Sequence, residues 1–220
     1  MVPPSKAQYE REGYWIVRGL HSAAQARDWK SLLSETVSAN PDPSGVKVWL
    51  SEELPDFLLA PMTHRATAEV LKEIVGSAVE FLSVKAVFKN PQVDFASPWH
   101  HDWFYWGGIP KISIWIALDD ASPENGCLKV IPGSHLQDFP LSKVESEKGF
   151  GNRIEDSLLE GLPWLSLPAK AGDAIFFSDR LVHSSHPNTS KKDRWSLIST
   201  YRSSATPDSS TVWKATLPLP

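Results

Sequence analysis

The sequence predicts a mainly β protein with flanking helices, folded as a double-stranded β-helix, that is, a cupin-like jelly roll of two sheets. Two helical segments precede seven or eight short strand segments, an order typical of a jelly roll with helices packed on one sheet. The 18 prolines and 12 glycines mark many turns, which favours a β-rich fold over a helical bundle. We expect residues 1–220 to form a single domain.

The first segments combine a short strand with a helix. Tyr14–Val17 is apolar and ends near Gly19, which predicts a strand. Ser22 is a suitable N-cap for a helix that runs to about Ala39. The apolar residues expected on its buried face are Trp29, Leu32, Leu33 and Val37.

A second helix is predicted after a turn-rich break over residues 40–45. Thr63 is expected to cap it, and Gly76 is placed to end it. Its predicted buried stripe consists of Val70, Leu71, Ile74 and Val75.

The rest of the chain has the alternation of strands. The predicted strands cover residues 79–89, 98–106, 111–118, 127–131, 174–177 and 194–202. Residues 136–168 are irregular, with the composition of a long loop that could cover a site.

Charge and composition exclude several classes of partner. The net charge of -4 gives no indication of a nucleic acid or an anionic membrane surface. No apolar run approaches the length needed to span a membrane, and one cysteine excludes an internal disulfide framework. We expect a cytoplasmic protein that acts on a small molecule, without a nucleic-acid or membrane partner. The oligomeric state stays open.

The stretch from Pro98 to Trp106 holds two adjacent histidines, an aspartate and five aromatic residues. In an extended strand His100 and Asp102 project to the same face, while His101 points away. An imidazole and a carboxylate side by side supply two ligands of a non-haem iron facial triad. A histidine brought in by the fold must supply the third, and His183 is the candidate.

A basic residue follows this histidine at a short distance. Arg194 lies eleven residues after His183, at the start of a predicted strand. Antiparallel strands joined by this loop would place both residues at one end of the barrel. A guanidinium inside a cavity needs an anionic partner, and a carboxylate bound by two hydrogen bonds fits it best.

The chain resembles the phytanoyl-CoA dioxygenase (PhyH-like) family of iron(II)- and 2-oxoglutarate-dependent oxygenases. The resemblance spans most of the chain and is weakest over residues 35–60 and 136–168. The matching motifs are Trp99-His100-x-Asp102, Trp115-Ile116-Ala117-Leu118-Asp119, Glu124-Asn125-Gly126-Cys127-Leu128, Pro132-Gly133-Ser134-His135, Gly172-Asp173, and His183-Ser184-Ser185 with Arg194.

The resemblance implies roles for these residues. It implies that His100, Asp102 and His183 bind iron(II). It also implies four residues around 2-oxoglutarate: Arg194 at its distal carboxylate, Ser185, Trp115 and Lys47. Lys47 would match an upstream lysine of the family, although its surroundings align poorly.

The implied activity is the oxidation of an unactivated C–H bond, by hydroxylation or demethylation, with O2 as oxidant and with succinate and CO2 as co-products. The substrate would be a small metabolite or natural product, and desaturation or ring formation would use the same iron chemistry. The aromatic residues Trp103, Tyr105 and Trp106 continue from the ligand stretch and are candidates for the substrate pocket.

Two other classes of function compete with this hypothesis. A non-catalytic jelly-roll module would bind a metal or ligand without turnover, and the complete set of ligands with Arg194 argues against it. A zinc hydrolase is the second alternative. The chain lacks a zinc motif such as H-E-x-x-H, and Arg194 would then have no purpose.

Overall fold

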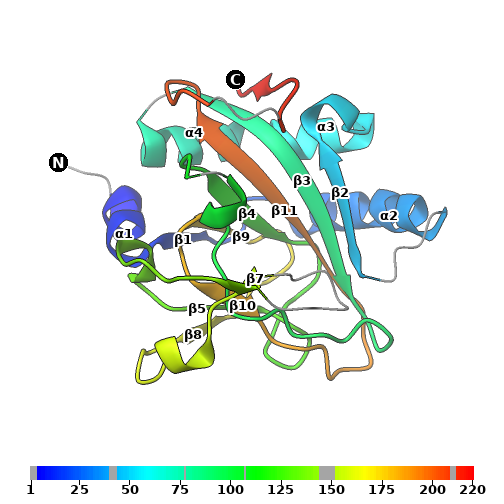
Figure 1. Cartoon of the computed structure of the whole chain (residues 1–220). Coiled ribbons are helices and arrows are strands. Elements are labelled where there is room, and N and C mark those ends of the chain that lie inside the picture. Colours follow the sequence, from blue (N-terminus) through cyan, green and yellow to red (C-terminus); the bar gives the residue numbers. More distant parts are fainter. Residues whose placement is uncertain (1–3, 40–43, 77, 107, 144–151, 209–211) are drawn as a thin grey trace.

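The computed structural model describes residues 4–39, 44–76, 78–106, 108–143, 152–208 and 212–220 (Figure 1). The α-helices are α1 (Pro4–Glu12), α2 (Ala23–Ala39), α3 (Asp56–Met62) and α4 (Arg65–Val75). Short 3-10 helices cover η1 (Ser51–Glu53), η2 (Trp103–Trp106), η3 (Ser134–Leu136) and η4 (Asp156–Leu158). The strands are β1 (Tyr14–Val17), β2 (Val46–Leu50), β3 (Val79–Lys89), β4 (Ile112–Ala117), β5 (Leu128–Val130), β6 (Ser142–Lys143), β7 (Asn152–Arg153), β8 (Leu165–Leu167), β9 (Ala174–Ser178), β10 (His183–Ser185), β11 (Arg194–Ser203) and β12 (Leu217–Pro218).

Two antiparallel sheets face each other across an apolar layer. The larger sheet has the order β1-β9-β4-β11-β3-β12, with β2 also paired to β3, and the smaller has the order β10-β5-β8. The layer between them combines Trp115, Ile175 and Phe177 of the larger sheet with Leu128 and Leu167 of the smaller one. This arrangement confirms the predicted double-stranded β-helix.

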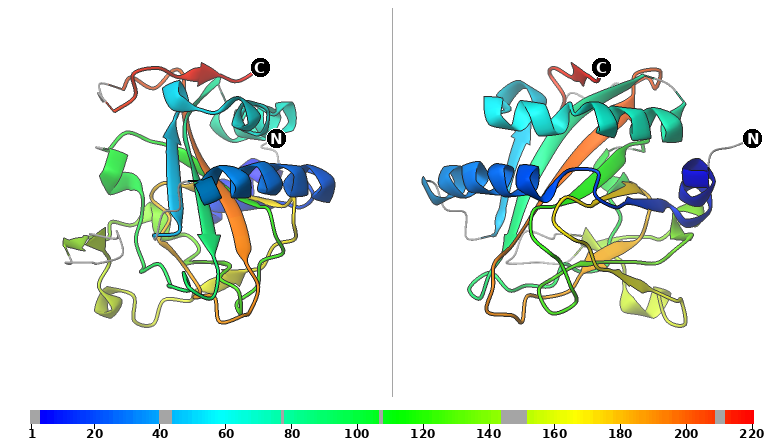
Figure 2. Two further views of the ribbon diagram at one scale, coloured as in Figure 1. Left: turned by 90° about the vertical axis from the view of Figure 1, so that its right-hand side faces the viewer. Right: turned by 180° about the vertical axis from the view of Figure 1, so that it is seen from behind.

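The helices cover the outer face of the larger sheet. Seen from behind, α2 and α4 lie across this face (Figure 2). The core between helices and sheet contains Ala26, Trp29, Leu33, Leu58, Met62, Leu71, Ile112, Ile114, Ile116, Phe176 and Leu197. Strand alternation on β4 therefore separates two layers, because Ile112, Ile114 and Ile116 face the helices while Trp115 faces the other sheet.

The start of α2 agrees with the sequence. Ser22 Oγ accepts a hydrogen bond from Gln25 N at 3.1 Å, and Gln25 Oε1 accepts one from Ser22 N at 2.9 Å. This reciprocal pair is a capping box. Leu32 was wrongly predicted to be buried, because its side chain is 42% exposed at the edge of the apolar face.

The start of α4 differs from the prediction. His64, not Thr63, is the N-cap residue, and no side chain caps this end. Thr63 instead ends α3, with its backbone N–H and its hydroxyl both bonded to Leu59 O. Gly76 ends α4 as predicted, in the left-handed conformation at φ 75°.

The strand predictions hold for the long strands and fail for the metal-ligand stretch. β3, β4, β9 and β11 lie where the alternation places them. Residues 98–106 are not a strand: His100 makes an isolated bridge to His183, and the chain then bends into η2. The helices α1 and α3 and the strands β2, β6, β7, β8 and β12 were not predicted. Most of them are short, and several lie in turn-rich segments.

In the part of the chain that the structure describes, no helix has the length and apolarity needed to cross a lipid bilayer.

A buried histidine couples the fold to pH. His21 is 1% exposed beneath Trp29 and His64, at ring-centroid distances of 4.8 and 4.9 Å. Neither ring nitrogen has a hydrogen-bond partner among the described residues. Burial, with a smaller effect of His64, lowers the pKa of His21 to about 4. The unfolded chain therefore binds this proton more tightly than the folded one.

We predict that His21→Phe makes the protein less sensitive to acid. The folded state loses stability as pH falls from about 6.5 towards 4, because the unfolded state then gains a proton that folded His21 excludes. Between pH 6.5 and 5 this amounts to on the order of 2 kcal/mol, at about 1.36 kcal/mol per pH unit. Urea unfolding of wild type and variant at both pH values measures it. Equal losses of stability in the two proteins would refute the role of His21.

Candidate active site

His100, Asp102 and His183 meet between the two sheets. All three side chains are buried, and one ligand atom from each lies within 4.8 Å of the other two. His100 N donates to His183 O at 3.0 Å and His183 N donates to His100 O at 2.9 Å. This pair of backbone hydrogen bonds places the two imidazole centroids 4.2 Å apart. His100 Nε2 lies 4.0 Å from Asp102 Oδ1.

The hydrogen bonds of the two histidines determine which nitrogen faces the centre. Nδ1 of His100 donates to Pro98 O at 2.8 Å, and Nδ1 of His183 donates to Leu181 O at 2.9 Å. Each Nε2 is then left with a lone pair, the state in which imidazole binds metals. Burial lowers the pKa of both rings, so both are neutral at physiological pH.

Asp102 is ionised beside these neutral rings. Burial opposes its ionisation, but the charge of Lys85 and a hydrogen bond from Ser113 Oγ at 3.3 Å hold its pKa below the usual range. Two neutral imidazoles and one carboxylate, with room for other ligands, form the donor set of non-haem iron(II) oxygenases. The chemistry of these residues therefore fits iron(II).

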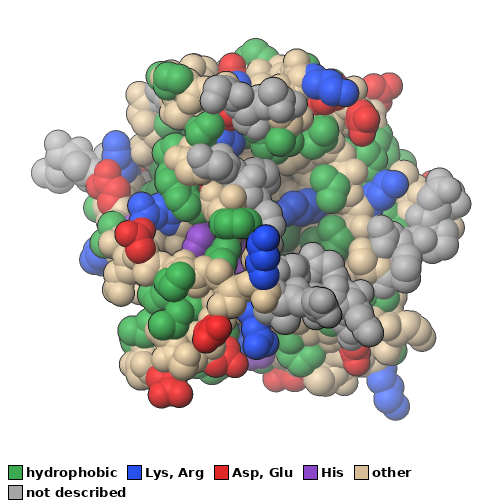
Figure 3. Space-filling view, viewed as in Figure 1, with side chains coloured by type: hydrophobic (Ala, Val, Ile, Leu, Met, Phe, Trp, Pro, Cys, Tyr) green, Lys and Arg blue, Asp and Glu red, His purple; other side chains and the backbone are tan. Residues whose placement is uncertain are grey.

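A cavity of about 540 Å³ opens beside the three residues. In the space-filling view the molecule is hollowed near the centre of this face, where hydrophobic and basic side chains meet (Figure 3). Its lining includes Val46, Val48, Lys85, Val87, Lys89, Phe95, Trp115, Leu128, Phe177, Ser185, Arg194 and Ile198. The cavity is thus mostly apolar, with three basic side chains in its wall.

Arg194 is a buried cation at one end of this cavity. Its side chain is among the largest that are fully buried, and the residue is 1% exposed. Nη1 donates to Ser196 Oγ at 2.7 Å, and Nη2 donates to Gly126 O at 2.9 Å. The guanidinium lies 5.7 Å from the Trp115 ring centroid. No described carboxylate lies within 4.0 Å of it, so its charge is available for an anionic ligand.

Gly126 makes room for this cation. Its φ is +100°, and a Cβ there would lie 2.7 Å from Lys89 Cδ and 3.3 Å from Arg194 Nη2. A side chain at this position would therefore displace both basic residues.

Lys89 is a second buried cation beside Arg194, and the sequence did not single it out. It pairs with Arg194 in the register of β3 and β11 and is 1% exposed. Its Nζ donates to Ser185 Oγ at 2.8 Å, Phe95 O at 2.7 Å and His186 O at 2.5 Å. Burial, with the charges of Arg194 and Lys129, lowers its pKa to about 7. The pairing of β3 with β11 could not be predicted from the sequence. Given that pairing, strand alternation places Lys89 on the same face as Arg194.

Lys89 orients the hydroxyl group of Ser185. Ser185 Oγ accepts from Lys89 Nζ and lies 3.2 Å from Ser97 N and 2.8 Å from Ser97 Oγ. These contacts hold the Ser185 hydroxyl group at the cavity wall. Of the residues expected around 2-oxoglutarate, the structure brings together Arg194, Ser185 and Trp115.

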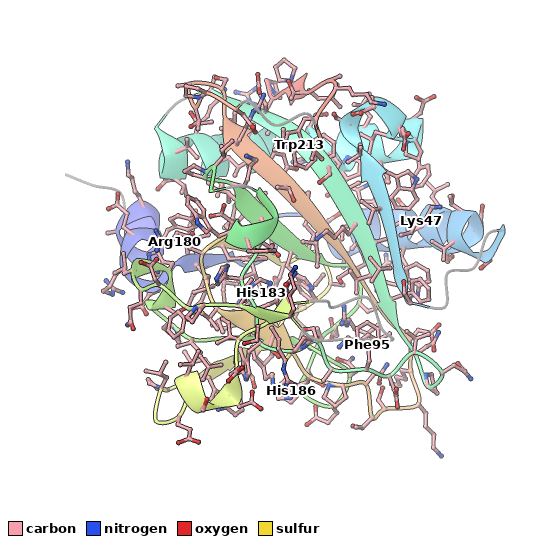
Figure 4. The ribbon with its side chains drawn as sticks, in the orientation of Figure 1. Lys47, Phe95, Arg180, His183, His186 and Trp213 are labelled. Carbon is pink, nitrogen blue, oxygen red and sulfur yellow. The ribbon has the colours of Figure 1, made fainter. Side chains whose placement is uncertain are left out.

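Lys47 does not lie at the cavity. On β2 the residues facing it are Val46 and Val48, and strand alternation puts Lys47 on the opposite face. Figure 4 shows Lys47 on β2, well apart from His183. The lysines that line the cavity come from β3, namely Lys85 and Lys89.

Of the aromatic residues after Asp102, Trp103 and Phe104 do not line the main cavity. Trp103 faces a second cavity of about 260 Å³, where Arg180 lies 5.3 Å from its ring centroid. His101 lies there too, away from the metal ligands as predicted, with Nε2 3.0 Å from Phe139 O. The turn into η2 after Asp102 redirects Trp103. Tyr105 and Trp106 belong to η2, and their side chains lie outside the described part of the structure.

Residues 136–168 were predicted to be a loop that could cover a site. The described part of this segment contains β6, β7, η4 and β8, and η3 ends at its first residue. Gln137, Asp138, Phe139 and Pro140 line the second cavity, whereas no described residue of 136–168 lines the main one.

Two curated relatives resemble parts of the chain. A phytanoyl-CoA dioxygenase domain-containing protein 1 homolog of Dictyostelium discoideum is 33% identical over 115 residues, covering 49% of this chain and 41% of the relative. The L-proline trans-4-hydroxylase of Streptomyces griseoviridis is 29% identical over 158 residues, covering 62% of this chain and 59% of the enzyme. The chain thus spans about half the length of the curated relatives it matches.

A solved structure and a family model cover more of the chain. The epimerase SnoN, crystallised with Fe3+, alpha ketoglutarate and nogalamycin RO, has a TM-score of 0.75 at 22% identity and covers 93% of this chain and 84% of its own. That likeness supports the fold. The model of the family described as phytanoyl-CoA dioxygenase (PhyH) matches residues 9–196. The chain therefore belongs to the phytanoyl-CoA dioxygenase family, as its motifs predicted.

Proposed function

We propose that this protein is a 2-oxoglutarate-dependent non-haem iron dioxygenase that oxidises an unactivated C–H bond of a small metabolite or natural product. The observation that carries the proposal is the buried His100–Asp102–His183 cluster, which opens into a cavity with the unpaired cation Arg194. Bound iron(II) and 2-oxoglutarate would supply the activation of O2, with succinate and CO2 as co-products.

The three clustered residues are proposed to hold the metal, and four others to act on the cosubstrate. Arg194 offers its charge to the distal carboxylate, Ser185 donates its hydroxyl proton, Lys89 orients that hydroxyl, and Trp115 forms the flat wall beside the guanidinium. The apolar lining excludes water from the reacting C–H bond. Among the described residues that line the cavity, Lys85, Lys89 and Arg194 are basic and Asp102 is acidic. A dianionic cosubstrate complements this positive charge.

The substrate is proposed to be small. The cavity of about 540 Å³ must hold cosubstrate and substrate together. Relatives named for L-proline and for ectoine support a small-molecule substrate. Among the described residues of the cavity wall, Lys85 is the one basic residue that the cosubstrate does not use. One lysine is too few to bind the phosphates of coenzyme A. We also propose a cytoplasmic location, which the buried, unpaired Cys127 supports.

The ligand assignment makes a first prediction. His100→Ala, Asp102→Ala and His183→Ala should each abolish iron-dependent succinate formation and weaken iron binding, because each removes one of three donor atoms. His101→Ala is the matched control and should keep iron, since this ring lies at the second cavity. Equilibrium dialysis and succinate assays measure both effects. Loss of iron from the His101 variant with retention in the His100 variant would contradict the assignment.

The cosubstrate anchor makes a second prediction. Arg194→Leu should weaken 2-oxoglutarate binding by about 2–5 kcal/mol, roughly 30-fold or more, with iron affinity little changed. Arg194→Lys should fall between, because lysine keeps the charge and loses the two-pronged geometry. Arg180→Leu, at the second cavity, is the control. An unchanged 2-oxoglutarate dependence in Arg194→Leu would exclude this role.

The Lys89 pKa of about 7 makes a third prediction. The wild-type KM for 2-oxoglutarate should rise as pH increases through about 7, because Lys89 then loses the proton with which it holds Ser185. In Lys89→Met the KM should be higher at pH 6 and nearly independent of pH up to 8.5, with kcat less affected. Steady-state succinate assays at constant ionic strength measure both profiles. Parallel profiles in the two proteins would rule out the positioning role.

A further inference from the structure

Lys85 is a basic residue of the main cavity that the proposed cosubstrate site does not use. It lies in the interior of β3, half-buried, between Val48 of β2 and Ile198 of β11. Both cross-strand neighbours are apolar, so the sheet itself provides no partner for its charge. The ammonium of this half-buried lysine can therefore be paired only by an anion outside these strands, from elsewhere in the chain or from a ligand.

The described residues supply no such anion. No carboxylate among them lies within 4.0 Å of Lys85 Nζ, and this group makes no hydrogen bond with them. Its charge nevertheless acts on Asp102 and His183, which places the ammonium near the metal ligands. The carboxylate of Asp102 is the acidic group on which this charge acts, and the proposed function assigns that carboxylate to the metal.

Lys85 is also distant from the cosubstrate anchors. It lies four residues before Lys89 on β3, roughly 13 Å along an extended strand. Trp115 occupies the same row of the sheet, because both residues pair with Ile198 of β11. Two strand spacings separate β3 from β4, about 9–10 Å. Lys85 thus lies on the β2–β3 side of the cavity wall, and Ile198 of β11 separates it from Trp115.

The surface around Lys85 is apolar. Val48 lies beside it, and Val46 and Val87 form the next cross-strand pair on the same face. A ligand on this wall meets the cation Lys85 and three neighbouring valines, and Lys89 follows two residues after Val87 on the same strand. This arrangement suits a small molecule with one anionic group and an aliphatic body.

We propose that Lys85 is the substrate anchor, binding the carboxylate of a small aliphatic acid whose apolar part lies on Val46, Val48 and Val87. This inference rests on the proposed function, since it names the substrate class of that site. The ion pair between Lys85 and the substrate carboxylate sets which end of the substrate lies near the metal ligands. The valines favour an apolar aliphatic chain. The same wall disfavours a neutral or cationic substrate, because Lys85 would stay unpaired.

The test is anaerobic calorimetry on the protein loaded with iron(II) and 2-oxoglutarate. The probes are hexanoate and cyclohexanecarboxylate, each compared with its neutral amide of nearly the same shape. The wild type should bind the acids about tenfold or more tightly than the amides, and Lys85→Met should reduce this ratio to near one. Lys85→Arg should keep the preference, and Lys85→Glu should transfer it to hexylamine. Lys143→Met, which removes an exposed lysine of β6, should behave as the wild type.

Two results would overturn the inference. One is a wild type without preference for the acids over the amides, and the other is a Lys85→Met variant that keeps the full preference. Succinate formation without added substrate, measured in the same proteins, separates this failure from failure of the proposed function. Turnover of 2-oxoglutarate without acid preference refutes only the substrate anchor. Absence of iron-dependent succinate formation in the wild type refutes the dioxygenase itself.

Discussion

Two backbone hydrogen bonds between His100 and His183 hold the site together. They join a loop before η2 to the first residue of β10, at an isolated bridge. Because the bonds are reciprocal, the two residues form a directly opposed antiparallel pair with side chains on the same face. Both imidazoles are then oriented by carbonyl groups two residues earlier in the chain. The proposed metal ligands therefore depend on main-chain pairing, which is insensitive to the side chains around it.

The second organising factor is an imbalance of charge within the cavity. Among the described residues that line it, Lys85, Lys89 and Arg194 are basic and Asp102 alone is acidic. Lys89 donates to three oxygen atoms and Arg194 to two, so both side chains are positioned before a ligand enters. Such preorganised cations bind anions without the cost of ordering flexible side chains. Burying these cations destabilises the folded protein, and binding of an anionic ligand offsets that cost.

Much of the fold followed from hydrophobic patterning, and the site followed from motif spacing. The long strands were predicted because their alternation is regular, as in β4, and His100, Asp102, His183 and Arg194 were singled out by order and spacing. The failures have local causes. Trp103 was assigned to the cavity on the assumption of a continuing strand, but the chain bends after Asp102. Lys47 was chosen from the family resemblance and Lys89 was overlooked, because the face on which a side chain lies depends on strand register and β2 was not predicted.

The strand β2 forms part of the cavity wall but lies apart from the proposed metal and cosubstrate residues. β2 pairs only with β3 and carries none of the proposed metal or cosubstrate residues, yet it contributes Val46 and Val48 to the wall. By contrast, Gly126, Lys89 and Arg194 are packed so closely that none can change alone. Substitutions at Val46 and Val48 can therefore reshape the cavity wall without touching Gly126, Lys89 or Arg194, so the fold allows its pocket and its charged centre to change separately.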